Sequence, residues 1–475
     1  MKPRNPLITG TIILTLTGLV SRLIGFFYRI FLSNVFGAEG MGIYQLIAPV
    51  LALSFALTVS GIQTAISKYV ASETSTKDYH TSFRTLLVGF TLAMALSVLC
   101  AFSIYLFSAQ IAEVFLLEKR TAPLLRIIAL SIPMATVHSC INGYFYGIRQ
   151  TAIPAISQLA EQICRVGSVY LIYFFCSQQG MQPTISFAVV GLVIGESASM
   201  IVSLIAIFAR AHHVFPSKQA IPALVQRQQL RSHTAASMPQ YLEITRKLLA
   251  LSIPLAANRI ILNLLQSIEA IYIPNRLMLF GLSNADALGV YGVLTGMSLP
   301  LILFPSAITN SISVLLLPVV AEADDNGNHH TITRAILQSF RYCLLLGFAC
   351  TAFFLLFGRL AGRILFHSEL AGDFIITLCF ICPFLYLAST LGSILNGLGK
   401  TTLTFLYSVL SLLLRLVFVF FAIPVYGIKG YLWGMLASQI LQTVLCTISA
   451  LAIPKSIYYN KCVFASHFRG RARNK

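Results

Sequence analysis

The chain has 475 residues, of which 57% are hydrophobic and only 10% are charged, and its net charge is +18. Soluble proteins carry about 25% charged residues, so this composition excludes a soluble globular protein. The basic residues lie mostly between apolar runs, as in membrane proteins whose loops are held on one side by Lys and Arg. No basic domain rich in aromatic residues is present, so nucleic acid is not expected as a partner.

Runs of 18 or more apolar residues recur along the whole chain and predict an all-α polytopic membrane protein. The expected spans are 7–32, 43–70, 84–110, 124–146, 153–176, 184–209, 247–273, 288–317, 338–358, 372–396, 403–424 and 430–454. We expect an N-terminal six-helix lobe at 1–210, an inter-lobe linker at 211–246, a C-terminal six-helix lobe at 247–455 and a basic tail at 456–475.

The distribution of positive charge predicts the topology. When a residue at the end of a span is counted with the nearer side, the side that holds both termini and the even-numbered connections carries 21 of the 33 Lys and Arg residues and the opposite side carries eight. The remaining four, Arg22, Arg165, Arg259 and Arg415, fall within spans. The positive-inside rule therefore places the termini, the linker and the tail in the cytoplasm. The expected location is a membrane that the chain crosses many times.

The first span carries two arginines, Arg22 and Arg29, in an otherwise apolar stretch. Seven residues make nearly two helical turns, so the two side chains point the same way, about 10 Å apart along the axis. A charge at mid-membrane costs on the order of 3 kcal/mol, so such residues normally face a bundle interior or a wet cavity. Arg29 is close enough to the end of its helix that snorkelling to the interface is an alternative.

The fifth and sixth spans contain further charges. Glu161 and Arg165 are four residues apart with the acid first, the favourable order for a self-neutralising pair, and we interpret them as structural. Glu196 has no local partner, and its two interpretations are a protonation site and a hydrogen-bonded residue in a packed helix. His138, in the fourth span, is interpreted as a packed side chain.

The seventh span is also polar. Arg259, Asn263 and Gln266 share one helical face, and Arg276 lies just past the end of the span. We expect Arg22, Arg29, Arg259 and Arg276 to bind the anionic group of a substrate, because the guanidinium fork donates two hydrogen bonds to phosphate at once. Glu269 is a possible charge partner, and a structural Arg22–Glu269 ion pair is the competing interpretation.

Other candidate motifs are rejected. Residues 397–401, GLGKT, have Ile394 where a phosphate-binding loop needs its first glycine. Asp324 and Asp325 with the nearby His329 and His330 are interpreted as a solvated loop, and Cys379 and Cys382 as packing residues within an apolar run. We expect no catalytic residues, no metal site and no bound cofactor, and the protein is not expected to be an enzyme.

The sequence contains an internal repeat. Four landmarks of the first half, Pro133, Gly147, Thr151 and Arg165, recur 250 positions later as Pro383, Gly397, Thr401 and Arg415. Arg29 matches Arg276, and Arg22 matches Glu269, at a spacing of 247. Each copy has six spans and so begins and ends on the same side, which predicts parallel lobes of the kind that bind substrate between them and alternate access by rocking.

Residues 21–29, SRLIGFFYR, and 36–44, FGAEGMGIY, resemble the opening of the SpoVB-type polysaccharide biosynthesis proteins. These are relatives of the lipid II flippases in the multidrug/oligosaccharidyl-lipid/polysaccharide flippase (MOP) superfamily, which includes the MATE transporters. The resemblance implies a MATE-like fold and a flippase for an undecaprenyl-pyrophosphate-linked saccharide, such as a peptidoglycan precursor for the spore cortex. It also implies that Arg22 and Arg29 line the central cavity and contact the pyrophosphate.

Three other functions stay open at this point. A MATE-type drug or cation antiporter would need acidic residues where Arg22 and Arg29 stand, and a membrane-bound glycosyl- or phosphotransferase would need acidic or His clusters at the membrane edge. A non-transporting scaffold for cell-wall enzymes is the third. The expected partners are the lipid-linked saccharide, membrane lipids and cell-wall synthesis enzymes, and coupling is left open among H⁺, Na⁺ and the membrane potential.

Overall fold

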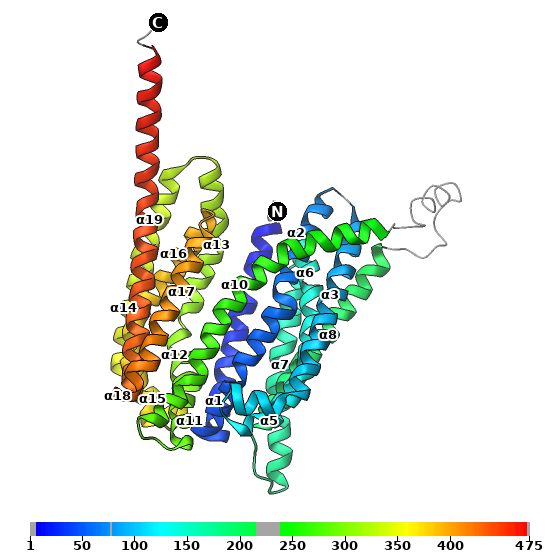
Figure 1. The fold of residues 1–475 in the computed structure, drawn as a ribbon, viewed down its shortest axis with the longest axis vertical. Helices are drawn as coiled ribbons and strands as arrows, with labels where there is room; N and C mark the ends of the chain where they lie inside the picture. The colour runs from blue at the N-terminus through cyan, green and yellow to red at the C-terminus, as the bar shows by residue number, and fades with distance from the viewer. Residues whose placement is uncertain (1–5, 77, 215–237, 473–475) are drawn as a thin grey trace, which may run out of the picture. The chain divides into compact units, whose positions relative to one another are not determined.

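The computed structural model describes residues 6–76, 78–214 and 238–472. Within these ranges every regular element is helical, which confirms the predicted all-α class (Figure 1). Side chains are described in the same ranges except at 6–9, 11, 12, 211–214, 238–240, 314, 315, 318 and 453–472. Most of the predicted linker 211–246 and the end of the predicted tail, residues 473–475, lie outside the described residues.

The chain divides into two compact units, Met1–Ile271 and Tyr272–Lys475. The main helices of the first unit are α1 (Pro6–Phe55), α2 (Gly61–Ser75), α3 (Tyr79–Leu106), α5 (Ala122–Ala129), α6 (Ser131–Gly147), α7 (Ala152–Gln178), α8 (Ser186–Val214) and the first part of α10 (Met238–Leu279). Those of the second unit are α11 (Asn284–Gly292), α12 (Leu299–Leu303), α13 (Ser306–Asp325), α14 (His329–Phe366), α15 (Glu369–Leu378), α16 (Cys382–Gly397), α17 (Thr401–Val417), α18 (Ile423–Tyr426) and α19 (Ile428–Ala472).

In the described residues, ten helices are long and apolar enough to cross a membrane, or eleven if the bent pair Lys119–Ala129 and Ser131–Gly147 counts as one span. The first of them, Ile13–Ser75, is 63 residues long and covers most of the first predicted span, 7–32, and all of the second, 43–70. The backbone breaks between them at Gly37, whose φ of 68° and ψ of −174° suit glycine best.

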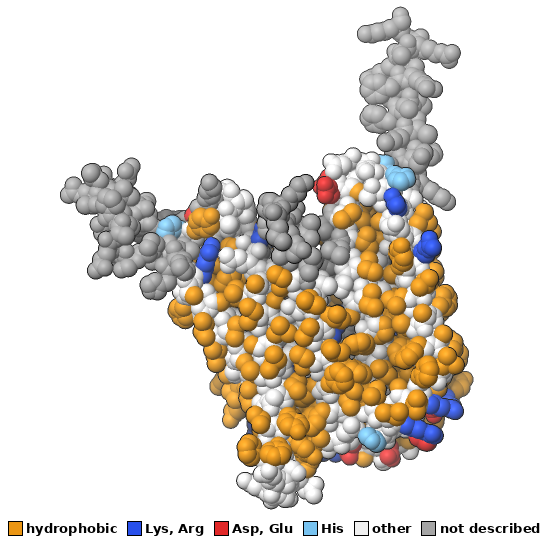
Figure 2. Space-filling model, turned by 180° about the vertical axis from the view of Figure 1, so that it is seen from behind, with side chains coloured by type: hydrophobic (Ala, Val, Ile, Leu, Met, Phe, Trp, Pro, Cys, Tyr) orange, Lys and Arg blue, Asp and Glu red, His pale blue; other side chains and the backbone are white. Residues whose placement is uncertain are grey.

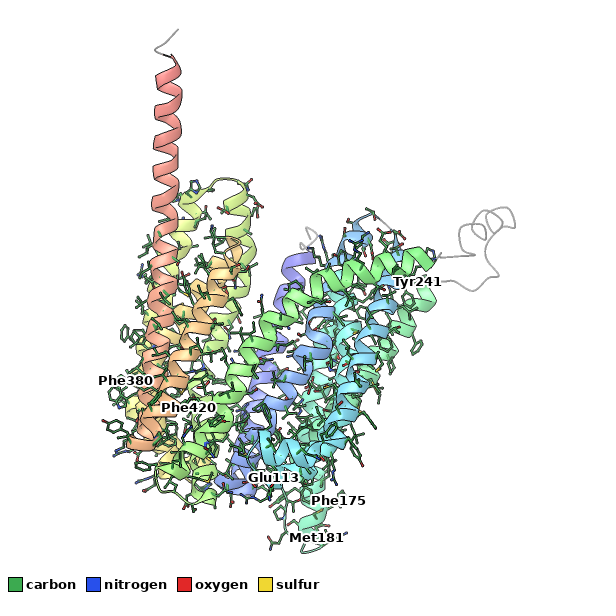
Figure 3. All side chains as sticks on the ribbon, viewed as in Figure 1. Glu113, Phe175, Met181, Tyr241, Phe380 and Phe420 are labelled. Atoms are coloured by element: carbon green, nitrogen blue, oxygen red, sulfur yellow. The ribbon has the colours of Figure 1, made fainter. Side chains whose placement is uncertain are left out.

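The outer surfaces of these helices are suited to lipid. In an 18-residue apolar stretch of α7 only 6% of the residues are buried. Phe174 and Phe175 are exposed near the end of this helix, where Figure 3 labels Phe175. Figure 2 shows hydrophobic side chains along the flanks of the helices, with most of the visible charged side chains toward helix ends. Apolar surface of this extent would associate in water. The chain is therefore a multi-pass membrane protein.

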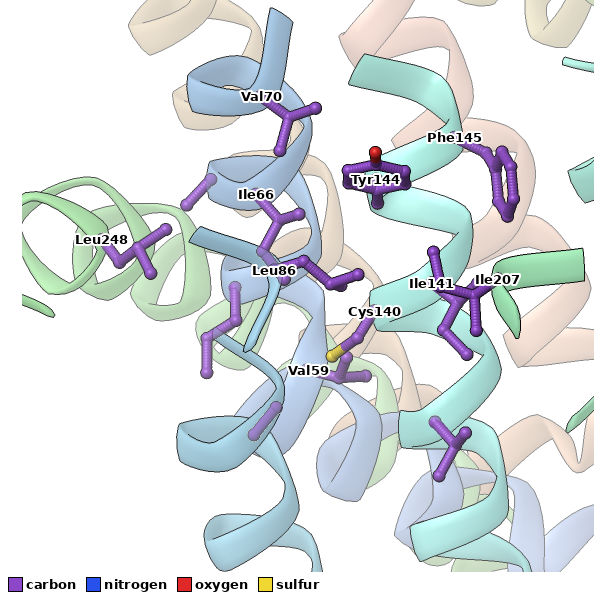
Figure 4. Packing of buried hydrophobic residues seen from close by; sticks show 14 of the residues in the cluster. Val59, Ile66, Val70, Leu86, Cys140, Ile141, Tyr144, Phe145, Ile207 and Leu248 are labelled. Atoms are coloured by element: carbon purple, nitrogen blue, oxygen red, sulfur yellow. The ribbon is translucent and has the colours of Figure 1, made fainter. Parts of the chain in front are cut away.

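The core of the first unit is a cluster of buried side chains contributed mainly by α2, α3 and α6 (Figure 4). Tyr144 and Phe145 are 1% exposed, and their rings meet edge to face at 5.7 Å between centroids. Ile66 and Val70 of α2 lie on the side of Tyr144, whereas Phe145 lies on the other side of α6. Since lipid is as apolar as these side chains, close packing rather than exclusion from water holds such helices together.

Close packing at two glycines shows that the sequence repeat is also a structural repeat. A Cβ on Gly147 would lie 2.8 Å from the carbonyl oxygen of Ser67 and 2.7 Å from Val70, and a Cβ on Gly397 would lie 2.8 Å from the carbonyl oxygen of Leu317 and 3.5 Å from Val320. Leu317, Val320 and Gly397 lie 250 positions after Ser67, Val70 and Gly147, so the same contact occurs in both units.

Helix caps repeat at the same spacing. The carboxylate of Asp78 accepts a hydrogen bond from the Thr81 N–H at 3.0 Å and caps α3. The amide oxygen of Asn328 accepts one from the Thr331 N–H at 3.2 Å and caps α14. The equivalent elements of the two units therefore begin with the same local chemistry.

We predict that Gly147→Ala destabilises the protein by about 1–3 kcal/mol, because the new methyl group must displace Val70 or the α2 backbone. Gly397→Ala should act in the same direction in the second unit. Gly167→Ala is the matched control: nothing lies within 4 Å of its added Cβ, so alanine's helix propensity should leave stability unchanged or raise it by up to about 1 kcal/mol. Thermal unfolding in detergent measures all three, and equal loss in Gly147→Ala and Gly167→Ala would contradict the close contact.

Candidate functional site

The two arginines of α1 lie in different surroundings. Arg22 is exposed, whereas Arg29 is half-buried and has the phenol of Tyr44 as an electrostatic neighbour. Close by, the ring of Phe31 packs edge to face against Tyr173 of α7, at 5.5 Å between ring centroids. This contact fixes α1 against α7 near Arg29.

The polar residues of α10 are divided by the boundary between the units. Asn263 donates a hydrogen bond from Nδ2 to the carbonyl oxygen of Ala52 at 2.9 Å and so attaches α10 to α1. On the same part of α10, Arg259 is exposed and Glu269 is 5% exposed. The grouping of the arginines around one substrate, and the Arg22–Glu269 pair, stay predictions.

Arg276 belongs to the second unit and is held there by aromatic rings. Its guanidinium carbon lies 4.8 Å from the ring centroid of Phe420 (labelled in Figure 3) and 5.7 Å from that of Tyr272. An arginine stacked in this way keeps its charge and its planar donor fork.

A different group of charges does come together in the first unit, on α6, α7 and α8. It consists of His138, Glu161, Arg165 and Glu196, which we call the charged cluster. Each of the four side chains is between 14% and 17% exposed. His138 Nε2 lies 2.8 Å from Glu196 Oε2, and Arg165 Nη2 pairs with Glu161 and lies 3.7 Å from Glu196 Oε1.

The sequence of α8 explains how α7 and α8 approach closely enough to form this cluster. Small residues recur every four positions on one face of α8, at Gly191, Gly195, Ser199 and Ser203. A Cβ on Gly195 would lie 2.8 Å from the carbonyl oxygen of Glu161, and Ser157 Oγ bonds with Ser199 Oγ at 2.6 Å. Small residues at this spacing are typical of tightly packed membrane helices.

The structure confirms one sequence prediction about these residues and adds a contact that the sequence did not predict. The Glu161–Arg165 pair forms as the i, i+4 spacing predicts. Glu196 has no partner within its own helix, as expected, but it pairs across helices with His138 and lies near Arg165. His138 is mostly buried, as expected of a packed side chain, and Glu196 is its hydrogen-bond partner.

Two cavities open beside the charged cluster. One, of about 350 Å³, is lined by Gln63, Asn142 and Gln158 together with His138, Glu161 and Glu196. The other, of about 110 Å³, has Ser54, Thr58, Ser131 and Thr136 among its lining residues, and it also reaches Glu196. Glu196 therefore lines both cavities.

One ligand atom from each of His138, Glu161 and Glu196 lies within 4.8 Å of the other two, a geometry that could surround a cation. The Arg165 guanidinium lies among the same carboxylates, however, and its fixed positive charge opposes a metal ion there.

A sequence profile described as "Polysaccharide biosynthesis protein" matches residues 7–324. The chain belongs to the polysaccharide biosynthesis protein family. Among relatives of this family member in Bacillus subtilis (strain 168), stage V sporulation protein B is 28% identical over 96% of this chain and 85% of its own length. The lipid II flippase MurJ of the same organism is 23% identical over 87% of this chain and 76% of its own.

The fold of this family member is that of the MOP superfamily. A solved inward-facing multidrug resistance MATE transporter of that superfamily superposes with a TM-score of 0.66, over 92% of this chain and 96% of its own, at 15% identity. The superposition confirms the expected MATE-like fold, and the family match confirms the resemblance seen at residues 21–44.

We predict that Arg165→Met destabilises the first unit by about 3 kcal/mol, because it leaves two buried carboxylates with one compensating charge fewer. The double variant Glu161→Gln with Arg165→Met should recover part of this loss. Equilibrium unfolding in detergent, followed by circular dichroism, measures both. Arg363→Met is the control, because its partner Glu369 is 79% exposed and such surface pairs contribute about 0–1 kcal/mol. Equal effects of Arg165→Met and Arg363→Met would contradict the buried pairing.

Proposed function

We propose that this protein is a flippase that moves an undecaprenyl-pyrophosphate-linked saccharide across the bacterial plasma membrane by alternating access. The observation that carries the proposal is the placement of Arg22 and Arg29 in a bilayer-length apolar helix of a polysaccharide biosynthesis protein. Its relative MurJ is a lipid II flippase by name, and the MATE-like fold is one that alternates access. Translocation breaks no covalent bond, so we propose no enzymatic activity.

The chemistry of the substrate suits these residues. The lipid tail of such a molecule stays in the bilayer while its pyrophosphate and sugars cross, so the protein must offer a polar path with positive charge. An arginine binds phosphate oxygens through two parallel N–H donors, which combines charge with direction. In the proposed path Arg22 and Arg29 hold the pyrophosphate first, and Arg259 and Arg276 are candidates for further contacts.

The saccharide and the cellular role form the finer part of the proposal. The name of stage V sporulation protein B supports a role in spore formation, and the name of the lipid II flippase MurJ supports a peptidoglycan precursor as the cargo. The excess of Lys and Arg on one side supports cytoplasmic termini, so that the precursor is taken up from the inner leaflet. Cell-wall synthesis enzymes that consume the precursor outside are the expected partners.

We predict that Arg22→Ala and Arg29→Ala each lower the flipping rate about tenfold or more, which corresponds to about 1.4 kcal/mol of lost interaction. The measurement uses proteoliposomes that contain lipid II or another lipid-linked saccharide, with the outer-leaflet fraction followed over time. Arg22→Lys and Arg29→Lys should retain part of the rate, because a lysine keeps the charge but loses the planar fork.

Arg359→Ala is the control for this experiment. Arg359 is 73% exposed and pairs with Asp373 at 3.3 Å, so its loss should leave flipping unchanged. Full activity of Arg22→Ala and Arg29→Ala at normal expression would refute the assigned roles. Absence of flipping by the wild type with every lipid-linked saccharide tried would refute the function itself.

A further inference from the structure

The charges of the cluster in the first unit do not balance when its histidine is neutral. Glu161 and Glu196 carry two negative charges and Arg165 carries one positive charge. The remaining negative charge is costly at this depth of burial unless something neutralises it. We propose that the His138–Glu196 pair is a reversible proton-binding site that takes up one proton per cycle of the protein.

The geometry of the pair fits a shared proton. His138 Nε2 and Glu196 Oε2 are 2.8 Å apart, a hydrogen-bonding distance. The second ring nitrogen, Nδ1, is buried and has no hydrogen-bond partner among the described residues, so the ring retains one nitrogen that can take a proton. Imidazole is the side chain that changes charge between about pH 5 and pH 8. A hydronium ion in the adjoining cavity donates the proton and becomes a water molecule.

Access to the pair is built into the first unit. Glu196 lines both the cavity of about 350 Å³ and the cavity of about 110 Å³, and Phe55 lies in the wall of each. A π-helical turn, Ala56–Ser60, follows Phe55 directly, and it places Thr58 in the smaller cavity. Single π-turns occur often at functional sites, where they let a helix shift.

Comparison of the two copies of the internal repeat shows which contacts around the site occur in both units and which ionisable residues occur in the first unit alone. The serine contact Ser157–Ser199 has its counterpart 250 positions later in Tyr407–Ser449, whose hydroxyl oxygens are 2.5 Å apart. Arg165 likewise corresponds to Arg415. The remaining positions of the charged cluster correspond to Ala388, Ser411 and Cys446. The second unit thus builds the same helix contacts without these ionisable groups, so packing alone does not require them in the first.

A proton is favoured over a metal ion by the position of Arg165. Its guanidinium already pairs with Glu161 and lies near Glu196, so a cation would have to displace or face a fixed positive charge. A proton needs no such displacement, because His138 Nδ1 can take it while the Nε2–H donates to Glu196. Binding of a metal ion is therefore the alternative that the experiment must separate.

Other ionisable side chains lie near the charged cluster. Tyr28 and Tyr44 of α1 lie near Arg165, and Tyr146 lies in the wall of the larger cavity. A link between proton uptake at the cluster and movement of the cargo rests on the proposed function.

The first test needs no substrate. Infrared difference spectra of the purified full-length protein, recorded across a pH titration, should show carboxyl and imidazole bands that change together. Glu196→Gln and His138→Gln should both abolish this coupled change. Glu243→Gln, which alters an exposed acid paired with Lys247, should preserve it. Unchanged spectra in Glu196→Gln, verified as folded by its elution and melting profile, would overturn the proposal. So would stoichiometric binding of Na⁺ or Zn²⁺, measured by equilibrium dialysis, that Glu196→Gln removes.

The second test asks whether proton binding at this site is coupled to flipping of the lipid-linked saccharide. In proteoliposomes with an imposed pH gradient, wild-type flipping should change rate when an ionophore collapses the gradient, and Glu196→Gln should lose this response. Flipping that responds to the gradient equally in both proteins would overturn the coupling role. If no saccharide is flipped at all, the proposed function fails, while the infrared titration still decides whether the proton site exists.

Discussion

The first unit depends on ion pairs and hydrogen bonds that compensate buried charges, because water does not reach these charges to solvate them. Arg165 and Glu161 on α7, and Glu196 and His138 on adjacent helices, are each mostly buried, and each is tolerated only because the others lie within bonding distance. That requirement fixes how closely α7 and α8 must pack, and it accounts for Gly195, where any larger residue would separate them. Helix packing and charge placement are therefore one constraint.

Because the chain is a repeat, its two halves show which features belong to the fold. Contacts at Gly147 and Gly397, and the capping residues Asp78 and Asn328, occur in both units and serve structure. The acids of the charged cluster occur in one unit only. Divergence between copies of one scaffold points to a specialised role, as it does for Arg22, whose counterpart in the repeat is Glu269. The second unit is in this sense an internal control for the first.

The sequence predicted the fold well because apolar run length and glycine placement are local signals. Spans 7–32 and 43–70 were separated correctly although the helix appears continuous, since Gly37 marks the break. The Glu161–Arg165 pair was also accessible from its four-residue spacing. The hydrogen bond between His138 and Glu196 could not be predicted from the sequence, because 58 residues separate them and no local pattern shows that α6 packs against α8. Comparing the two copies residue by residue would have singled out these positions.

Electrostatics also constrains how a proton and an anionic cargo influence one another. A proton on the His138–Glu196 pair would add positive charge to the unit that also holds Arg22 and Arg29, and more positive charge would strengthen binding of a pyrophosphate there. Linkage makes the effect reciprocal, so a bound pyrophosphate would raise proton affinity by the same factor. On charge alone the two ligands favour each other and travel together. Exchange in opposite directions would require a conformational change that reverses this preference, so the sign of the coupling distinguishes transport in the same direction from exchange.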